Sequence, residues 1–373
     1  MDGVAAGDGS GGAVSGAGDV NGDGLADLLI GAYGAPSGDF SGASYVVFGR
    51  DTGLFPAGLD LLSLDGRNGF RLDGAAGDRS GFAVSAAGDV NGDGLADLLI
   101  GAPDAGASYV VFGHTGRFPA SLNLSSLDGR NGFRLDRSGY SVSAAGDVNG
   151  DGLADLLIGA PNAGPNDMSQ AGASYVVFGR DTAFPANLEL SSLDGTNGFQ
   201  LNGVAAGDLS GRAVSGAGDV NGDGLADLLI GASGAPNGER SGASYVVFGR
   251  DTPFPAKLEL SSLNGTNGFQ LNGVRADDYS GRAVSGAGDV NGDGLADLLI
   301  GAYRARPNGI DSGASYVVFG RDTAFPASLE LSMLDGTNGF RLNGVRAGDF
   351  SGRAVSGAGD VNGDGLADLL IGA

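Results

Sequence analysis

The sequence predicts an all-β fold built from repeated units, and three observations carry this prediction. A stretch of fifteen residues, 18–32, returns unchanged five more times, so that its first aspartate occurs as Asp19, Asp89, Asp147, Asp219, Asp289 and Asp360. Successive copies lie 70, 58, 72, 70 and 71 residues apart. Each copy contains a short apolar run bounded by glycine, which is typical of a buried strand. Because stacked repeats share one continuous core, we expect residues 1–373 to form a single domain.

One repeat unit contains four predicted strands, and the unit that begins near Ser210 shows them clearly. Residues 211–218 are almost all small, residues 227–232 form a continuous apolar run, and residues 243–249 are aromatic and β-branched. Residues 268–273 alternate apolar and polar, as expected for a half-exposed outer strand. Such a four-stranded antiparallel meander, repeated radially, is the blade of a β-propeller. A linear calcium-binding β-helix has hexapeptide or nonapeptide repeats, far shorter than this period.

The strand count predicts six blades, of which the last is incomplete. The first and second strands occur six times, whereas the third and fourth occur five times, and the chain ends at Ala373 directly after the sixth second strand. The chain therefore holds five full repeats and a C-terminal half repeat. An open edge at residues 369–371 would favour association with another strand. We expect either a longer chain or self-association through this last blade to complete it.

The repeated loop carries four oxygen-bearing side chains around a tight, glycine-containing turn. In the first copy these are Asp19, Asn21, Asp23 and Asp27. Hard oxygen ligands at this spacing suit Ca²⁺, which takes six to eight of them. An EF-hand is excluded because its loop needs a glutamate at the twelfth position, where this chain has Ile30. A dockerin module shares Gly-Asp-Val-Asn-Gly-Asp-Gly but continues as a helix, which the early glycine after Leu-Leu-Ile argues against. The alternative is a solvated glycine-rich turn without metal.

We expect one Ca²⁺ per repeat, six in all, held by equivalent side chains in each copy. Besides the four of the first loop, the predicted ligands are Asp89, Asn91, Asp93, Asp97, Asp147, Asn149, Asp151, Asp155, Asp219, Asn221, Asp223, Asp227, Asp289, Asn291, Asp293, Asp297, Asp360, Asn362, Asp364 and Asp368.

Composition excludes several classes of function. The formal charge is −23 and the chain lacks any cluster of lysine and arginine, so nucleic acid is not an expected partner. No apolar run approaches the length of a membrane span, so we expect no membrane insertion. There is no cysteine, and therefore no disulfide or thiolate site. No signal peptide is visible at Met1. Millimolar calcium nevertheless predicts an extracellular or cell-surface location.

These residues resemble the FG-GAP repeat, the unit of the integrin α-subunit propeller and of many bacterial surface and secreted proteins. The resemblance rests on the loop D-x-N-x-D-G-x-x-D, the following Leu-Leu-Ile-Gly-Ala and the strand Tyr-Val-Val-Phe-Gly. It implies that the loop joins the first and second strands and that one leucine per loop offers its backbone carbonyl to the ion. These leucines are Leu25, Leu95, Leu153, Leu225, Leu295 and Leu366.

The meander separates a constant face from a variable face. The acidic loops lie on one face, and the connections after the second and fourth strands lie on the other. The variable connections are residues 33–42, 103–106, 161–172, 233–242 and 303–313, together with the turns holding Asp8, Asp78, Asp208, Asp278 and Asp349. Binding residues are usually found on loops of a rigid scaffold, so we expect a protein or glycan ligand there. The alternative is that these loops vary without binding anything.

Several side chains of the variable face are candidates for ligand contact. One equivalent position near the channel mouth holds Gly12, Phe82, Tyr140, Arg212, Arg282 and Arg353. Its arginines either meet an acidic group of a ligand or pair with nearby aspartates. Tryptophan is absent, but Tyr33, Tyr140, Tyr279 and Tyr303 offer rings for a sugar. The Gly-Arg-Asp-Thr segments are interpreted as turns, and His114, in a degenerate copy, as a surface substitution.

The sequence therefore predicts a calcium-stabilised, non-enzymatic propeller that serves as a binding or adhesion scaffold. The propeller of a secreted carbohydrate-active lyase or hydrolase is the alternative from another class. Near-perfect repetition argues against it, because a catalytic site needs residues unique to one or two blades. A designed or trimmed repeat array without a native partner is the third possibility.

Overall fold

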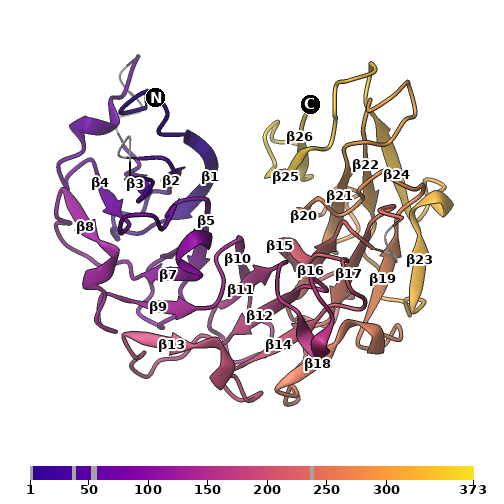
Figure 1. Ribbon diagram of the computed structural model, residues 1–373, viewed down its shortest axis with the longest axis horizontal. Coiled ribbons are helices and arrows are strands. Elements are labelled where there is room, and N and C mark those ends of the chain that lie inside the picture. Colours follow the sequence, from indigo (N-terminus) through magenta and orange to yellow (C-terminus); the bar gives the residue numbers. More distant parts are fainter. Residues whose placement is uncertain (1–2, 36–38, 52–56, 236–238) are drawn as a thin grey trace. The chain divides into compact units, whose positions relative to one another are not determined.

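The computed structural model describes residues 3–35, 39–51, 57–235 and 239–373, and it is an all-β structure (Figure 1). Within these ranges the regular elements are β-strands and short 3₁₀ turns. The predicted fold class is therefore confirmed. In the described part of the chain, no helix has the length and apolar character to cross a membrane. Parts of the predicted variable connections 33–42 and 233–242 lie outside the described residues.

The chain divides into two compact units. The first unit comprises Met1–Ala144, Leu153–Ile158 and Phe178–Leu193, and the second comprises Ala145–Gly152, Gly159–Val177 and Asp194–Ala373. The dividing line runs through the third repeat. That residues 1–373 behave as a single domain stays a prediction.

The first unit holds the sheets of the first two repeats. The strand order is β1-β2-β3-β4-β8 in one sheet and β13-β9-β7-β6-β5 in the other. The first sheet consists of β1 (Ser10–Gly18), β2 (Asp27–Ala32), β3 (Ala43–Val47), β4 (Gly69–Asp73) and β8 (Ser121–Asn123). The second consists of β5 (Ala83–Gly88), β6 (Asp97–Ala102), β7 (Ala107–Val111), β9 (Gly132–Asp136) and β13 (Asn187–Glu189).

The later repeats form equivalent sheets. The fourth repeat has the order β15-β16-β17-β19-β23, the fifth β20-β21-β22-β24, and the sixth only β25-β26. Their bounds are β15 (Ser210–Gly218), β16 (Asp227–Ala232), β17 (Ala243–Val247), β19 (Gly268–Asn272), β23 (Ser328–Glu330), β20 (Ala283–Gly288), β21 (Asp297–Ala302), β22 (Ala314–Val318), β24 (Gly339–Asn343), β25 (Ala354–Gly359) and β26 (Asp368–Gly372). Self-association through the two-stranded last sheet stays a prediction.

The third repeat and the 3₁₀ turns complete the inventory. The strands of the third repeat are β10 (Ser141–Gly146), β11 (Asp155–Ala160), β12 (Ala173–Val177) and β14 (Gly198–Asn202), and β18 (Lys257–Glu259) of the fourth repeat pairs with β14. The 3₁₀ turns are η1 (Leu61–Ser63), η2 (Pro103–Ala105), η3 (Leu124–Ser126), η4 (Pro165–Asp167), η5 (Leu190–Ser192), η6 (Leu260–Ser262) and η7 (Leu331–Met333).

A fifth strand, which the sequence did not reveal, covers the outer edge of a blade. It comes from the following repeat: β23 leaves the fifth repeat and runs parallel to β19 of the fourth (Figure 1). The pairs β4·β8, β9·β13 and β14·β18 repeat this arrangement. The fourth strand is consequently not an exposed rim, and both Phe269 and Leu271 are fully buried. The second to fifth repeats thus each stabilise the open edge of their predecessor, whereas the fourth strand of the fifth repeat, β24, has no such cover within the described residues.

An aromatic stack reinforces this exchange between repeats. The ring of Phe325, which precedes β23, lies on Phe269 with centroids 4.3 Å apart and an interplanar angle of 7°. The pairs Phe70–Phe118, Phe133–Phe184 and Phe199–Phe254 have the same stacked geometry. The phenylalanine of these four long connections is therefore a core residue of the preceding blade, where a buried aromatic ring contributes roughly 1.5–3 kcal/mol.

Small residues in the first and second strands allow neighbouring blades to approach closely. The N–H of Gly286 in β20 donates to Ser215 Oγ in β15 at 3.1 Å, and the N–H of Gly357 in β25 donates likewise to Ser285 Oγ. In β16, a Cβ added at Gly231 would lie 2.0 Å from the carbonyl oxygen of Gly281 in the next repeat. Only glycine fits at that position.

We predict that Gly231→Ala lowers the free energy of unfolding by about 1–3 kcal/mol, because the new methyl group forces the two repeats apart. Gly16→Ala is the matched control, since a Cβ there meets nothing within 4 Å; its effect should stay within about 0.5 kcal/mol. Urea unfolding measures both. Equal effects of the two substitutions would contradict the packing explanation.

Candidate functional site

Each acidic loop is organised by its first aspartate. The backbone N–H groups of Gly22, Asp23 and Gly24 donate to the Asp19 carboxylate at 2.7, 3.1 and 2.8 Å. Asn21 Oδ1 accepts a further bond from the N–H of Asp23 at 2.8 Å. The same bonds recur in the fourth and fifth loops. Three of the four predicted side chains therefore meet in one surface turn.

The fourth aspartate of the loop has a different environment, because it is buried at the start of the second strand. In the fourth repeat, Asp227 accepts the N–H of Val220 from its own loop and the N–H of Gly249 from the turn after β17, both at 2.9 Å. Burial raises the pKa of Asp227 to about 7, and the charges of Asp223 and Asp219 add to the rise. Asp97 and Asp297 lie in the same environment. This carboxylate ties the loop to the end of the third strand.

The Gly-Arg-Asp-Thr turn connects the acidic loops of the second, third and fourth repeats to the repeat that follows. The N–H of Arg321 donates to the carbonyl of Val220 at 2.9 Å, and the N–H of Ala296 donates to the carbonyl of Asp219 at 2.9 Å. The guanidinium of Arg321 also lies 4.2 Å from the centre of the Phe325 ring. The interpretation of these segments as turns did not include this contact, in which they bond to the acidic loop of the preceding repeat.

His114 has a defined place in this arrangement. Its ring stacks on Phe118 at 3.8 Å, in the position where Arg180, Arg250 and Arg321 lie over their phenylalanines. The backbone N–H of His114 donates to the carbonyl of Val20, as the backbone N–H of the equivalent arginine does in later repeats. It therefore takes the place of a packing arginine, and its side chain is exposed, as expected of a surface substitution.

The loops have the donor chemistry that Ca²⁺ requires, in the form of carboxylate, amide and carbonyl oxygens. A cavity of about 370 Å³ lies beside the first loop and is lined by Asp23, Leu25 and Asp51 among others. Among the described residues, no group of three or more acidic or histidine side chains converges closely enough to form a metal centre. The side chains instead bond to the backbone N–H groups around them. The predicted ligand set and the number of ions accordingly stay predictions.

Comparison with known proteins identifies the repeat. The model of the FG-GAP repeat matches residues 10–47, 80–112, 138–177, 210–247 and 280–318, about half of the chain. The chain belongs to the FG-GAP repeat family. Each match runs from the first strand through the acidic loop to the third strand, so the loop joins the first and second strands as the resemblance implied.

Curated relatives of the FG-GAP chain include integrins and a phospholipase D. Human phosphatidylinositol-glycan-specific phospholipase D is 32% identical over 59% of this chain and 28% of its own length. Integrin alpha-PS5 of Drosophila melanogaster is 34% identical over 43% of this chain and 15% of its own, and integrin alpha-5 of Xenopus laevis is 28% identical over 61% and 21%. The chain thus spans less than a third of these relatives. The V. cholerae biofilm matrix protein Bap1 is a solved structure with 18% identity, covering 63% of this chain and 37% of its own, at a TM-score of 0.31.

The variable connections bring several predicted aromatic residues together within each unit. In the first unit, Phe82 lies 6.0 Å from Tyr33 and 5.4 Å from Tyr140. In the second, Tyr279 lies 5.8 Å from Tyr303. The Arg282 guanidinium lies 5.6 Å from the Tyr303 ring centre. The candidate channel-mouth and tyrosine positions therefore form connected aromatic groups.

One position in the turn after each fourth strand has a left-handed backbone, which the sequence did not suggest. It precedes the Ser-Gly of the inner strand and is occupied by Gly9, Arg79, Arg137, Leu209, Tyr279 and Phe350, with φ between 51° and 87°. A non-glycine residue in this region costs roughly 1–2 kcal/mol. Large side chains are held here despite that cost, on the face where a ligand is expected.

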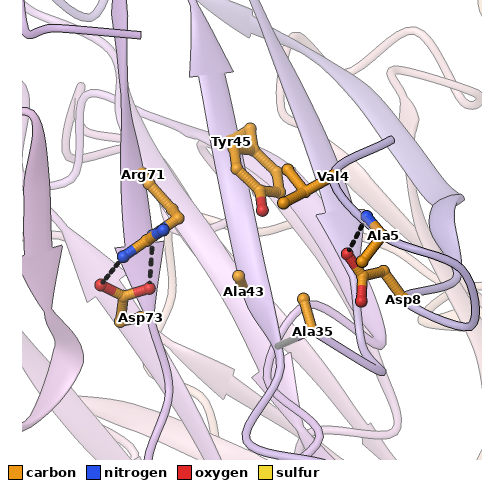
Figure 2. Close-up of a pocket in the computed structure, with 8 residues that line it drawn as sticks. All are labelled: Val4, Ala5, Asp8, Ala35, Ala43, Tyr45, Arg71 and Asp73. Carbon is orange, nitrogen blue, oxygen red and sulfur yellow. Dashed lines mark hydrogen bonds and ion pairs between the residues drawn. The ribbon is translucent and has the colours of Figure 1, made fainter. Parts of the chain in front are cut away.

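A cavity lies between the two variable connections of the first repeat (Figure 2). Its volume is about 190 Å³, and Asp8, Tyr45, Arg71 and Asp73 supply its polar groups. Arg71 binds Asp73 through two nitrogens, at 2.7 and 3.1 Å. Asp8 is 2% exposed, and one of its oxygens accepts the N–H of Ala5 at 2.8 Å. The Arg71–Asp73 pair neutralises itself, so the net charge of this cavity comes from Asp8.

The raised pKa of Asp227 gives a pH-dependent prediction for the calcium-free protein. Between about pH 4 and 7 the native state keeps a proton that the unfolded chain has lost, so this group contributes less stability as pH rises through that range. Asp227→Asn removes this titrating group. We expect the free energy of unfolding of the variant, relative to that of wild type, to be higher at pH 8 than at pH 5 by about 1–3 kcal/mol.

Urea unfolding in EGTA at the two pH values measures this difference. Asp194→Asn is the control, because Asp194 is exposed and its hydrogen bonds to Thr196 lower its pKa. The equivalent position of the next repeat is naturally an asparagine, Asn264. The effect of Asp194→Asn should be the same at both pH values. A pH-independent effect of Asp227→Asn would show that Asp227 is ionised throughout.

Proposed function

We propose that this chain is a calcium-stabilised propeller scaffold that binds a protein or glycan ligand and has no catalytic activity of its own. The observation that carries the proposal is the separation of roles between its faces. The acidic loops are bonded to the backbone of their own and the following repeat, whereas the repeat-specific side chains gather on the variable connections. A structural ion on one face and a ligand on the other follow from this separation.

Calcium would relieve an electrostatic conflict within each loop. Asp219, Asp223 and Asp227 lie close enough for the first two to raise the pKa of the third. A divalent cation among them would lower their mutual repulsion. The residues that would hold it are the predicted aspartates and asparagine with the leucine carbonyl of each loop. An extracellular or cell-surface location follows, because weak calcium modules of this kind fill at about 10⁻⁴–10⁻³ M.

The enzymatic alternative has one observation in its favour, the similarity to a phospholipase D. Because this chain corresponds to 28% of that relative, the similarity does not locate the catalytic residues in the shared part. His114, the one histidine of the sequence, packs against Phe118. A binding role, without chemistry, is therefore the proposal we favour.

Calcium removal tests the metal. We expect excess EGTA to lower the melting temperature by several degrees, since one site tenfold above its Kd adds about 1.4 kcal/mol to the native state. Asp223→Asn should reduce the rise in melting temperature on calcium addition, and Asp194→Asn should leave it intact. A melting temperature indifferent to EGTA would overturn the calcium assignment.

A glycan array and direct binding to purified cell-surface proteins, both in calcium, test the scaffold role. Specific binding that is lost on substitution within the variable connections would support it. Turnover of a polysaccharide or phospholipid by the purified chain would contradict the non-enzymatic assignment.

A further inference from the structure

The fifth repeat contains a second cavity, at the same place in the blade as the cavity of the first repeat. It is about 80 Å³ in volume, and its polar lining consists of Arg275, Arg306, Arg341, Asp278 and Tyr316. Arg275 and Asp278 come from the turn before β20, Arg306 from the connection after β21, and Arg341 from β24. Three separate segments of the second unit thus bring three guanidinium groups to one small cavity.

Two of these arginines are absent from the earlier repeats. Where the fifth repeat has Arg275, the first, second and fourth have Ala5, Ala75 and Ala205. Where it has Arg306, the sequences of the first and fourth repeats have proline. Arg275 recurs as Arg346 in the incomplete sixth repeat, but the combination of Arg275 with Arg306 and Arg341 occurs in the fifth repeat alone.

The third arginine has lost the acid that its equivalents bind. Arg71 and Arg134 pair with Asp73 and Asp136, two residues further along the strand. In the third and fourth repeats both positions are neutral, and Gln200 and Gln270 bond to their asparagines at 2.7 Å. The fifth repeat combines Arg341 with Asn343.

No carboxylate replaces the missing partner. Within the described residues, no carboxylate oxygen lies within 4.0 Å of the guanidinium nitrogens of Arg275, Arg306 or Arg341. The lining holds three arginines and one aspartate, a formal charge of +2 in a chain of −23. Asp278 offsets part of this charge through its electrostatic interaction with Arg275 and Arg306. The positive charge that remains favours an anionic group.

We propose that the cavity of the fifth repeat binds a carboxylate or sulfate group of an acidic saccharide. The planar guanidinium matches such oxyanions with paired hydrogen bonds. The volume suits one oxyanion group rather than a whole sugar, so the remainder of the saccharide lies outside the cavity. This proposal rests on the proposed function of the variable face and specifies its ligand.

The neighbouring tyrosines favour a saccharide over an acidic peptide. Tyr279 follows the cavity residue Asp278, and Tyr303 lies three residues before Arg306. Both rings are only partly buried, and Arg304 lies 5.6 and 5.9 Å from their centres. A pyranose ring presents an apolar C–H face that can pack on an aromatic ring. Aromatic rings on the same connections as the oxyanion cavity suit a charged sugar.

Isothermal titration calorimetry of the full chain in calcium, with a uronate oligosaccharide, a sulfated oligosaccharide and a neutral oligosaccharide of equal length, tests the proposal. At least one acidic oligosaccharide should bind, the neutral one should not, and the affinity should fall with added salt. The double variant Arg275→Ala/Arg306→Ala should weaken binding about tenfold or more.

Asn343→Asp is the sharper variant, because it keeps every arginine and restores the acid beside Arg341. We expect it to weaken binding about threefold to fivefold. Asn272→Asp is the control of equal charge on the equivalent strand of the fourth repeat, where it also removes the amide that donates to Glu330 Oε1 at 2.6 Å. Its affinity should match wild type. The melting temperature of each variant verifies that it is folded.

The outcomes separate this proposal from the scaffold function. Weakening by Asn343→Asp but not by Asn272→Asp supports the cavity as the binding site. Saccharide binding that neither variant affects, or that both weaken equally, overturns the cavity assignment and leaves the scaffold function standing. Binding of an acidic peptide in place of the saccharides overturns the ligand assignment alone. Failure to bind any glycan or protein refutes both proposals.

Discussion

The architecture depends on a buried carboxylate at the first position of the second strand. Asp227 accepts one N–H from its acidic loop and another from the turn that ends the third strand. The loop, β16 and β17 therefore cannot shift independently, because an unpaired buried N–H costs about 1–3 kcal/mol. The carbonyl of Val220, next to one of these N–H groups, accepts the N–H of Arg321 from the following repeat. One side chain thus organises a blade and its junction with the next.

This connection explains why the two faces of a blade differ in sequence. A change in the acidic loop disturbs backbone bonds in two repeats at once. A change at the left-handed turn position alters a side chain while the backbone bonds around it persist. Asp78 and Asp349 accept equivalent backbone N–H groups, from Ala75 and Arg346, although different residues follow them in the chain. Variation therefore accumulates where it has little structural effect, and that is also where it can provide recognition.

The sequence predicted the features that depend on local pattern, and it missed those that depend on contacts between repeats. The second strand was placed at residues 227–232, as observed, because its apolar run is bounded by a loop and a glycine. The fifth strand was missed because it is only three residues long, as in β23 (Ser328–Glu330), and its sequence has no strand pattern of its own. It becomes a strand by pairing with the outer strand of the preceding repeat. The stacking of His114 on Phe118 was missed for the same reason. The arginine-lined cavity required the register of β24 against the two connections, which no spacing in the chain displays.

The fifth repeat shows how a repeat protein can become specific without losing its fold. Two alternate positions of the fourth strand hold either arginine with aspartate or glutamine with asparagine, because the two side chains of each combination bond to one another. Combining Arg341 with Asn343 leaves the guanidinium without a carboxylate on its own strand, although it still bonds to Tyr316. A strongly acidic chain tolerates such a cation through its long-range field. Drift alone would scatter such cations over different blades. Here Arg275 and Arg306 arise in separate segments and line the same cavity as Arg341, so their convergence is better explained by an anion that all three contact.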